Sequence, residues 1–221
     1  MPVRELACLR LRNGEPFTSS ANEQTLRKLR AGILEQARHT NSATHVLSQI
    51  EDPSAFYILG KWESVSQHVH DWIPSETNQA IMGGLAEDVE LVFLEHLQLA
   101  SSGANKHEEG IPINADVIAI GRYFVSDGEK GGFQRTFDQT KQYLEQFNGG
   151  RGISGGWRED KEIASDQGQA REEFVLFSGW TSVDEHMQFA ESEGFKEFAK
   201  IKEFLSGAEI KHATVVFSSH P

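Results

Sequence analysis

The sequence is poor in cysteine, holding one, Cys8, among 221 residues. A single thiol cannot form a disulfide within the chain or a thiolate zinc site, so we expect Cys8 to be a small buried residue of a strand. No run of eighteen apolar residues occurs, and the N-terminus lacks the basic-then-apolar pattern of a secretory signal. We therefore predict a soluble, cytoplasmic protein.

Positive charge is also scarce. The chain has 21 lysine and arginine residues against 33 acidic ones, which gives a formal net charge of −12 at pH 7. Such a chain repels phosphate groups, and no local lysine or arginine cluster offsets the repulsion. We expect neither nucleic acid nor an anionic membrane as a partner.

What the sequence does contain is an internal similarity at an offset of 118 residues. The segment Phe56–Trp62 aligns without gaps on Phe174–Trp180, and both continue as Trp-x-Ser-Val-x-x-His, ending at His68 and His186. Similarity at a fixed offset indicates two copies of one structural unit.

The serines of this motif are predicted helix N-caps. Ser64 and Ser182 are followed three residues later by Gln67 and Glu185, which can close a capping box on the backbone amide of the serine. Each tryptophan should therefore end a strand, and each histidine should lie in the first turns of a helix.

Around this block, hydrophobic periodicity predicts the order strand, helix, strand, strand, helix, strand in each half. The first half has predicted strands at 5–12, 44–50, 56–62 and 90–97, and helices at 26–37 and 65–88, the latter broken near Pro74. The second half has predicted strands at 117–125, 153–161, 173–180 and 209–217, and helices at 133–147 and 183–206.

The predicted domain boundary lies in the small, polar stretch between the halves. We assign residues 1–99 to the first half, 100–115 to a linker and 116–221 to the second half. Both alternating sets of side chains in Phe56–Trp62 are apolar, so this strand should be covered on both faces. Packing of one half's sheet against the other would cover the second face.

This pattern resembles the antibiotic-biosynthesis-monooxygenase (ABM) branch of the dimeric α/β-barrel superfamily. The resemblance is carried by a strand ending in Trp, a serine-started helix with His and aromatic positions, and a final strand bearing His. The corresponding segments are 56–62, 64–72 and 91–96, then 174–180, 182–189 and 210–212. It implies an α+β fold of two ferredoxin-like βαββαβ units whose antiparallel sheets form a pseudo-twofold dimeric α/β barrel, with a pocket between sheet and helices.

Relatives of this kind include cofactor-free oxygenases of polyketide anthrones, haem-degrading oxygenases, polyketide cyclases and proteins without established chemistry. We predict a small-molecule enzyme of secondary, polyketide or aromatic metabolism, a cofactor-independent monooxygenase with a His base in a hydrophobic pocket. The alternatives are a cyclase, or a non-catalytic stress protein that binds a hydrophobic ligand or haem. The expected partner is a hydrophobic small molecule, with a homodimer of the fused chain also possible, and no cofactor is expected.

His96 is the first candidate for a catalytic base, because an imidazole in the apolar strand from Leu91 can face a pocket and titrates near neutral pH. The alternative is a hydrogen-bonded histidine of the core. His70 is the second candidate. It lies with Trp72 in a segment where the halves differ, which favours a single site in the first half.

Aromatic residues of the motif are candidates for substrate contact. Trp62 and Trp180 could floor a pocket and stack on a planar substrate, or only anchor a helix to the sheet. His68 and His186 occupy matching positions, so fold geometry alone could account for them. No metal site is expected, because residues i and i+2 of a helix point about 200° apart, which separates His68 from His70. Haem ligation by His96 or His70 stays an alternative.

Three further motifs have two interpretations each. Asn78 and the neighbouring Gln79 could bind a substrate carbonyl or cap the helix after Pro74. Trp157 and Arg158 could stack on and stabilise an enolate, or form an edge-strand pair facing solvent. The glycines of 150–155 match G-x-G-x-x-G, but a helix precedes and a strand follows, so we predict a turn and no nucleotide cofactor.

Overall fold

The structure is a computed structural model that describes residues 1–99, 110–160 and 172–221. It divides into two compact units, residues 1–98 with 213–221, and residues 99–212. Most of the predicted linker, 100–109, lies outside the described residues. No helix among the residues that the structure describes is long and apolar enough to cross a membrane.

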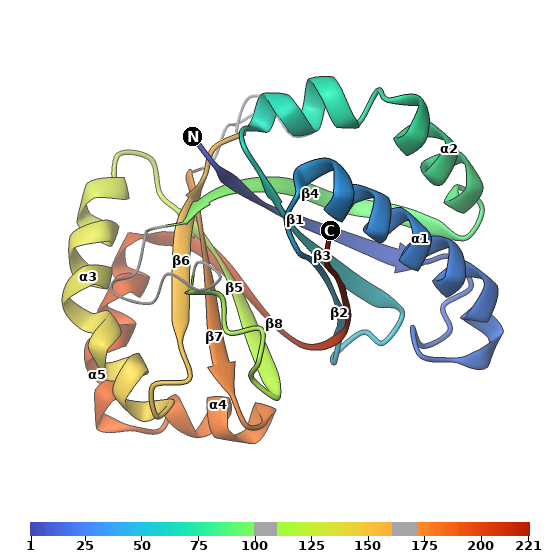
Figure 1. Cartoon of the computed structure of the whole chain (residues 1–221). Coiled ribbons are helices and arrows are strands. Elements are labelled where there is room, and N and C mark those ends of the chain that lie inside the picture. Colours follow the sequence, from blue (N-terminus) through green and yellow to red (C-terminus); the bar gives the residue numbers. More distant parts are fainter. Residues whose placement is uncertain (100–109, 161–171) are drawn as a thin grey trace. The chain divides into compact units, whose positions relative to one another are not determined.

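The first unit has the predicted βαββαβ order (Figure 1). Its elements are β1 (Val3–Leu11), a 3₁₀ turn η1 (Ser20–Asn22), α1 (Glu23–Thr40), β2 (Thr44–Gln49), β3 (Ala55–Trp62), a π-helical turn η2 (Gln67–Trp72), α2 (Glu76–Leu85) and β4 (Val89–Leu99). β1 pairs antiparallel with both β3 and β4, and β2 pairs antiparallel with β3. This is the strand order of a ferredoxin-like sheet.

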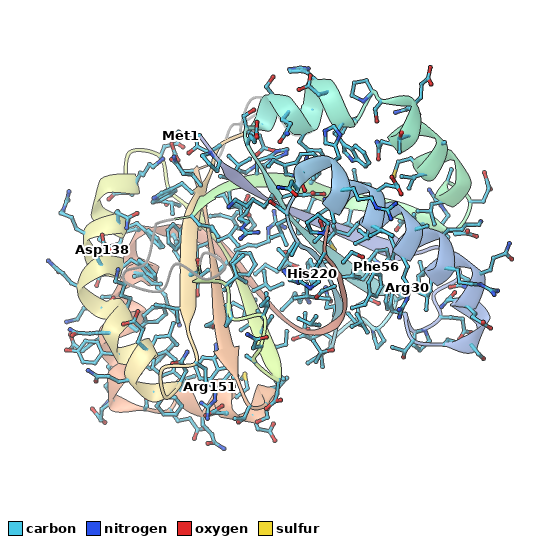
Figure 2. All side chains as sticks on the ribbon, viewed as in Figure 1. Met1, Arg30, Phe56, Asp138, Arg151 and His220 are labelled. Carbon is cyan, nitrogen blue, oxygen red and sulfur yellow. The ribbon has the colours of Figure 1, made fainter. Side chains whose placement is uncertain are left out.

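The hydrophobic core of this unit lies between one face of the sheet and the two helices. Alternate β1 residues, among them Ala7 and Leu9, pack with Phe56 of β3, Leu29 of α1 and Leu85 of α2. Phe56 is fully buried at the sheet, whereas Arg30 lies on the exposed side of α1 (Figure 2). Glu5 has the same strand parity as Ala7, so its side chain is on the helix-covered face.

The second unit repeats this order with a more divided second helix. Its elements are β5 (Val117–Val125), α3 (Lys130–Phe147), β6 (Ile153–Arg158), β7 (Glu172–Trp180), α4 (Val183–Phe189), α5 (Glu193–Phe198), the 3₁₀ helix η4 (Ala199–Phe204) and β8 (Leu205–Ser219). β7 pairs antiparallel with β5 and β6. On α3, Phe137 faces a phenylalanine-rich core while Asp138 points outward (Figure 2).

The long strand β8 contributes to both units. Its last residues, Ala213–Ser219, belong to the first unit and pair antiparallel with β2, from Gln49↔Ala213 to Thr44↔Ser219. In the sheet, neighbouring strands follow the order β1-β3-β2-β8-β5-β7-β6-β4, that of a closed barrel. The predicted fold class, α+β with antiparallel ferredoxin-like sheets in a barrel, is confirmed.

The prediction of one continuous helix over 183–206 is wrong, because the structure has three short helices there. Ser182 and Ser192 each accept a hydrogen bond from a backbone N–H three residues later, at 3.1 Å in both cases, so α4 and α5 start separately. Leu205 already belongs to β8. In the first unit, the predicted break near Pro74 is confirmed, because α2 starts afresh with Ser75 as its N-cap.

Two local predictions about caps and glycines are also decided. The N-cap serines are confirmed, but Gln67 and Glu185 accept hydrogen bonds from Glu63 N–H (2.8 Å) and Thr181 N–H (2.7 Å), one residue before the serine.

The glycine-rich stretch is a turn between α3 and β6, as predicted. Gly150 and Gly152 have φ of 72° and 98°, a region that suits glycine.

Candidate functional site

The candidate site is centred on Glu5, a carboxyl group on the helix-covered face of the first unit's sheet. Its side chain is buried, with the residue 4% exposed. The indole Nε1–H of Trp62 donates to Glu5 Oε2 at 2.8 Å, and the side-chain amide of Gln36 donates to the same oxygen at 2.7 Å. Strand β3 and helix α1 thus hold the carboxyl group from two sides.

Gly60 leaves the space that the carboxyl group occupies. It is the direct partner of Glu5 across the β1–β3 pair. A Cβ atom at this position would lie 2.5 Å from Glu5 Oε2 and 2.6 Å from Gln36 Nε2, closer than such atoms approach in proteins. A side chain at residue 60 is therefore incompatible with this arrangement.

Two buried histidines extend the cluster around Glu5. His68 Nδ1 and His96 Nε2 share a hydrogen bond of 2.7 Å. The His68 ring stacks on Trp62 with centroids 4.0 Å apart and an interplanar angle of 6°. His96 lies directly opposite Glu5 in the β1–β4 pair, so the carboxyl group, the indole and both imidazoles form one cluster.

Burial dominates the electrostatics of this cluster. It raises the pKa of Glu5 from 4.5 to about 7, because the ionised carboxylate loses its hydration. The Trp62 hydrogen bond, the charge of His96 and the Gln36 hydrogen bond act in the opposite direction and limit the rise. A group with a pKa near neutrality can carry a proton at working pH, and such groups occur often at functional sites.

The turn that carries His68 is π-helical. Ile73 N–H donates to His68 C=O at 2.9 Å, five residues back. Trp72 lies four positions after His68, whereas Phe189 lies three positions after His186 in the α-helical turn of the second unit. The first unit thus holds one extra residue here, and π-helical turns are frequent at functional sites.

An aromatic layer connects the cluster with the surface. The Trp72 ring lies 6.2 Å from Trp62, and the ring of His39, at the end of α1, lies 4.9 Å from Trp72 and 6.0 Å from Trp62. Trp72 is buried, whereas His39 is exposed. His39 is therefore the member of this aromatic layer that lies at the surface.

The second unit contains the same aromatic and imidazole frame without the carboxyl group. Trp180 stacks on His186 at 4.5 Å, and His186 Nδ1 shares a 2.7 Å hydrogen bond with His212 Nε2. The Trp180 indole donates instead to the Ser178 hydroxyl at 2.9 Å. Ala119 pairs with Ser178 as Glu5 pairs with Gly60.

The structure brings together four of the predicted site residues, Trp62, His68, Trp72 and His96. His70 is exposed, whereas His68 two residues earlier is buried. Asn78 donates its side-chain N–H to Ile73 C=O at 3.0 Å and so secures the entry to α2. Trp180 belongs to the frame of the second unit.

The remaining predicted pair, Trp157 and Arg158, is held within the second unit. Trp157 Nε1–H donates to Gln134 at 2.6 Å. Arg158 pairs with Asp160 at 2.8 Å and with Glu173 at 3.4 Å, both largely buried carboxylates. These contacts occupy the guanidinium in an internal ion-pair network.

Glu5, Gln36 and His39 are members of the site that sequence reasoning missed. One signal was available, since an acidic residue in the otherwise apolar stretch Glu5–Leu9 is unusual in a strand buried on both faces. A second was the change from Gly60 to Ser178 within the aligned motif. No signal in the sequence placed the end of α1 beside Trp72.

The cluster offers little to a metal ion between its imidazoles. His68 Nδ1 and His96 Nε2 are 2.7 Å apart, whereas two nitrogen ligands at about 2 Å from a tetrahedral metal ion lie about 3.3 Å from each other. These two nitrogens therefore bind a proton between them. The arrangement suits proton transfer rather than metal ligation.

No family model matches the sequence, and no curated protein is similar to it. Among solved structures, an anthrone oxidase-like protein has a TM-score of 0.65 at 12% identity, covering 99% of this chain and 93% of its own. A candidate monooxygenase from Fusobacterium nucleatum has a TM-score of 0.62 at 10% identity, covering 99% and 94%. The chain has the fold of these monooxygenase-type barrels.

A third similar structure is the candidate chlorite dismutase TA0507, with a TM-score of 0.63 at 11% identity, covering 97% of this chain and 95% of its own. The predicted resemblance to the ABM-like α/β barrels is confirmed at the level of the fold. Neighbours of one fold with different named activities do not select a reaction. The chemistry has to be argued from the cluster around Glu5.

Proposed function

We propose that the protein is a small-molecule oxygenase that needs no cofactor, with His96 of the first unit as the base. The observation that carries the proposal is the buried cluster in which Trp62 donates to Glu5 and stacks on His68, and His68 shares a hydrogen bond with His96, the residue opposite Glu5 in the sheet. A substrate with an acidic C–H group would give its proton to His96. The carbanion would then react with molecular oxygen.

The hydrogen bond between the imidazoles supports His96 as a base. When His96 takes up a proton, the bond to His68 Nδ1 spreads the positive charge over two rings. General base catalysis by a positioned imidazole typically contributes about 10²–10⁴-fold in rate.

The aromatic layer supports an aromatic substrate. The rings of Trp62, Trp72 and His39 lie 4.9–6.2 Å from one another, and a cluster of aromatic rings favours a planar aromatic ligand. Anthrone is a suitable probe, because its methylene group is acidic and the fold is shared with an anthrone oxidase-like protein. The reaction converts the methylene group and O₂ to a carbonyl group and water, so one oxygen atom enters the product.

The test compares His96→Phe with the matched variant His212→Phe, using anthrone and an oxygen electrode. We expect the wild-type protein to form one anthraquinone per O₂ consumed. His96→Phe should lose about 10²-fold or more of that rate, while His212→Phe should retain it. Equal rates in the two variants, or no turnover by the wild-type protein, would contradict the proposal.

A second candidate function is a non-catalytic body in which the histidines only support the fold. Its motivation is that the Trp–His–His frame occurs in both units, and that Glu5 and His96 are 4% and 1% exposed. If this second candidate is correct, His96→Phe and His212→Phe lose stability to a similar extent, and neither the variants nor the wild-type protein oxidise anthrone. Thermal melts of the two variants beside the oxygen assay separate the two candidates.

A further inference from the structure

The geometry points to Glu5 as a hydrogen-bond donor to a carbonyl oxygen of the substrate. The inference rests on the proposed function and deepens it, because it makes the substrate a ketone whose acidic C–H group is conjugated with that carbonyl. Glu5 would then act on the opposite end of the reacting system from His96.

The two oxygens of the Glu5 carboxyl group differ in how well they can carry a proton. Trp62 Nε1–H and Gln36 Nε2–H both donate to Oε2. Oε1 receives no hydrogen bond from the part of the chain that the structure describes. An oxygen that already accepts two N–H groups is the poorer site for a proton, so a neutral Glu5 carries its O–H on Oε1.

The neutral form of Glu5 is populated at neutral pH. Burial raises the pKa of Glu5 to about 7, so a large fraction of the carboxyl groups is protonated at neutral pH. A carboxylic acid kept neutral by an apolar site can donate a hydrogen bond to an oxyanion. The ionisable group that acts on Glu5 is His96, its partner on β4, while β3 and α1 present the neutral groups of Gly60, Trp62 and Gln36.

The proposed donor, Glu5, and the proposed base, His96, lie opposite each other on neighbouring strands. Glu5 and His96 are direct partners across two strands, which places their Cβ atoms about 4.5–5.5 Å apart. In the reaction the C–H bond breaks, the proton moves to His96, and the electron pair is delocalised onto the carbonyl oxygen. That oxygen becomes an enolate stabilised by the Oε1–H group, which keeps its proton.

The second unit provides the matched control for this role. Ala119 and Ser178 stand where the first unit has Glu5 and Gly60, and the Ser178 hydroxyl serves the tryptophan N–H. The double variant Glu5→Ala/Gly60→Ser therefore gives the first unit a combination that already occurs in a folded unit of this chain. Glu5→Gln is the conservative variant, since its amide can accept from Trp62 and Gln36 and donate from the Oε1 position.

The experiment is the pH profile of anthrone oxidation by the full chain and these two variants. We expect the wild-type rate to fall as pH rises through about 7, because Glu5 loses its donor proton. Glu5→Gln should retain turnover and lose this fall. Glu5→Ala/Gly60→Ser should lose about 10²–10³-fold in rate, the usual effect of removing one donor to an oxyanion. An inactive Glu5→Gln, or a fully active double variant, would overturn the inference.

A binding experiment tests the same role without turnover, so failure of the proposed function stays distinguishable. Anthraquinone offers a carbonyl oxygen and has no C–H group to lose. By titration calorimetry we expect its affinity for the wild-type protein to weaken as pH rises through about 7, and its affinity for Glu5→Gln to be independent of pH. Absence of binding to the wild-type protein, or the same pH dependence in Glu5→Gln, would overturn the inference even if anthrone is oxidised.

Discussion

The two units share one frame and differ in what surrounds it. In each, a tryptophan at a strand end stacks on a histidine whose Nδ1 shares a 2.7 Å hydrogen bond with a second histidine. The first unit adds a carboxyl group to this frame, a glycine that makes room for it and a π-helical turn. The second unit has Ala119, Ser178 and an α-helical turn at those positions.

The comparison separates what the fold needs from what chemistry needs. A Trp–His–His cluster that recurs in both units can be explained by packing and hydrogen bonding alone. A carboxyl group is costly to bury, and the second unit has Ala119 at the position that corresponds to Glu5, so folding alone does not account for Glu5. The outer layer differs in the same sense, since Phe147 lies 6.3 Å from Trp180 where His39 lies 6.0 Å from Trp62.

The largest expected effect is on the tryptophans. Trp62→Ala and Trp180→Ala should each destabilise the protein by about 3–5 kcal/mol, because each ring is fully buried. Trp62→Ala should cost about 1 kcal/mol or more beyond Trp180→Ala, since it also removes a donor from a buried carboxyl group. Chemical denaturation measures both, and equal costs would argue against a special role of the carboxyl group.

The next effect is on the pH dependence of stability. The pKa of Glu5 is 4.5 when exposed and about 7 when folded, so the folded protein holds the proton more tightly. The contribution of Glu5 to stability is therefore fully present below pH 4.5 and is lost, by about 3 kcal/mol, as pH rises to about 7. Glu5→Gln should remove this contribution. Denaturation of both proteins at pH 5 and pH 8 checks it, and parallel changes in the two would contradict it.

A smaller and equal effect is expected at the shared helix caps. Ser64→Ala and Ser182→Ala each remove an acceptor for a backbone N–H at 3.1 Å and should cost about 1 kcal/mol. Thermal denaturation of the two variants provides the measurement. A much larger loss in one of them would show that the shared frame is not energetically equivalent in the two units.

The smallest effect on stability is expected at His39, the exposed member of the aromatic layer. His39→Phe copies the aromatic residue of the second unit and should change stability by less than about 1 kcal/mol. If His39 contacts the substrate, the KM for anthrone should change while the melting temperature stays close to that of the wild-type protein. An unchanged KM would remove His39 from the substrate path.

Most of the fold followed from the sequence. The aligned motif carried strands β3 and β7, the serine caps and the order of elements, because apolar alternation and capping are local signals. The division of the segment 183–206 into three short helices was not predicted, because it depends on a second cap at Ser192 within an apolar pattern. The pairing of Ala213–Ser219 with β2 is a long-range contact that no local signal contains.

The site was predictable only in part. His96, His68 and the two tryptophans could be named because the motif repeats, and whether they act in catalysis stays a prediction. Glu5 lies 91 positions before His96 in the sequence, so only strand pairing brings the two together. Its altered proton affinity comes from burial, which a sequence pattern does not report.

The account depends most directly on the ionisation of one carboxyl group. A ¹³C NMR titration of glutamate-labelled protein, with Glu5→Gln to assign the signal, measures it. The account predicts a carboxyl resonance that titrates with a pKa of about 7 in the wild-type protein and is missing from the variant. A Glu5 resonance that titrates at its ordinary value near 4.5 would contradict the claim that the first unit holds a proton where the second holds none.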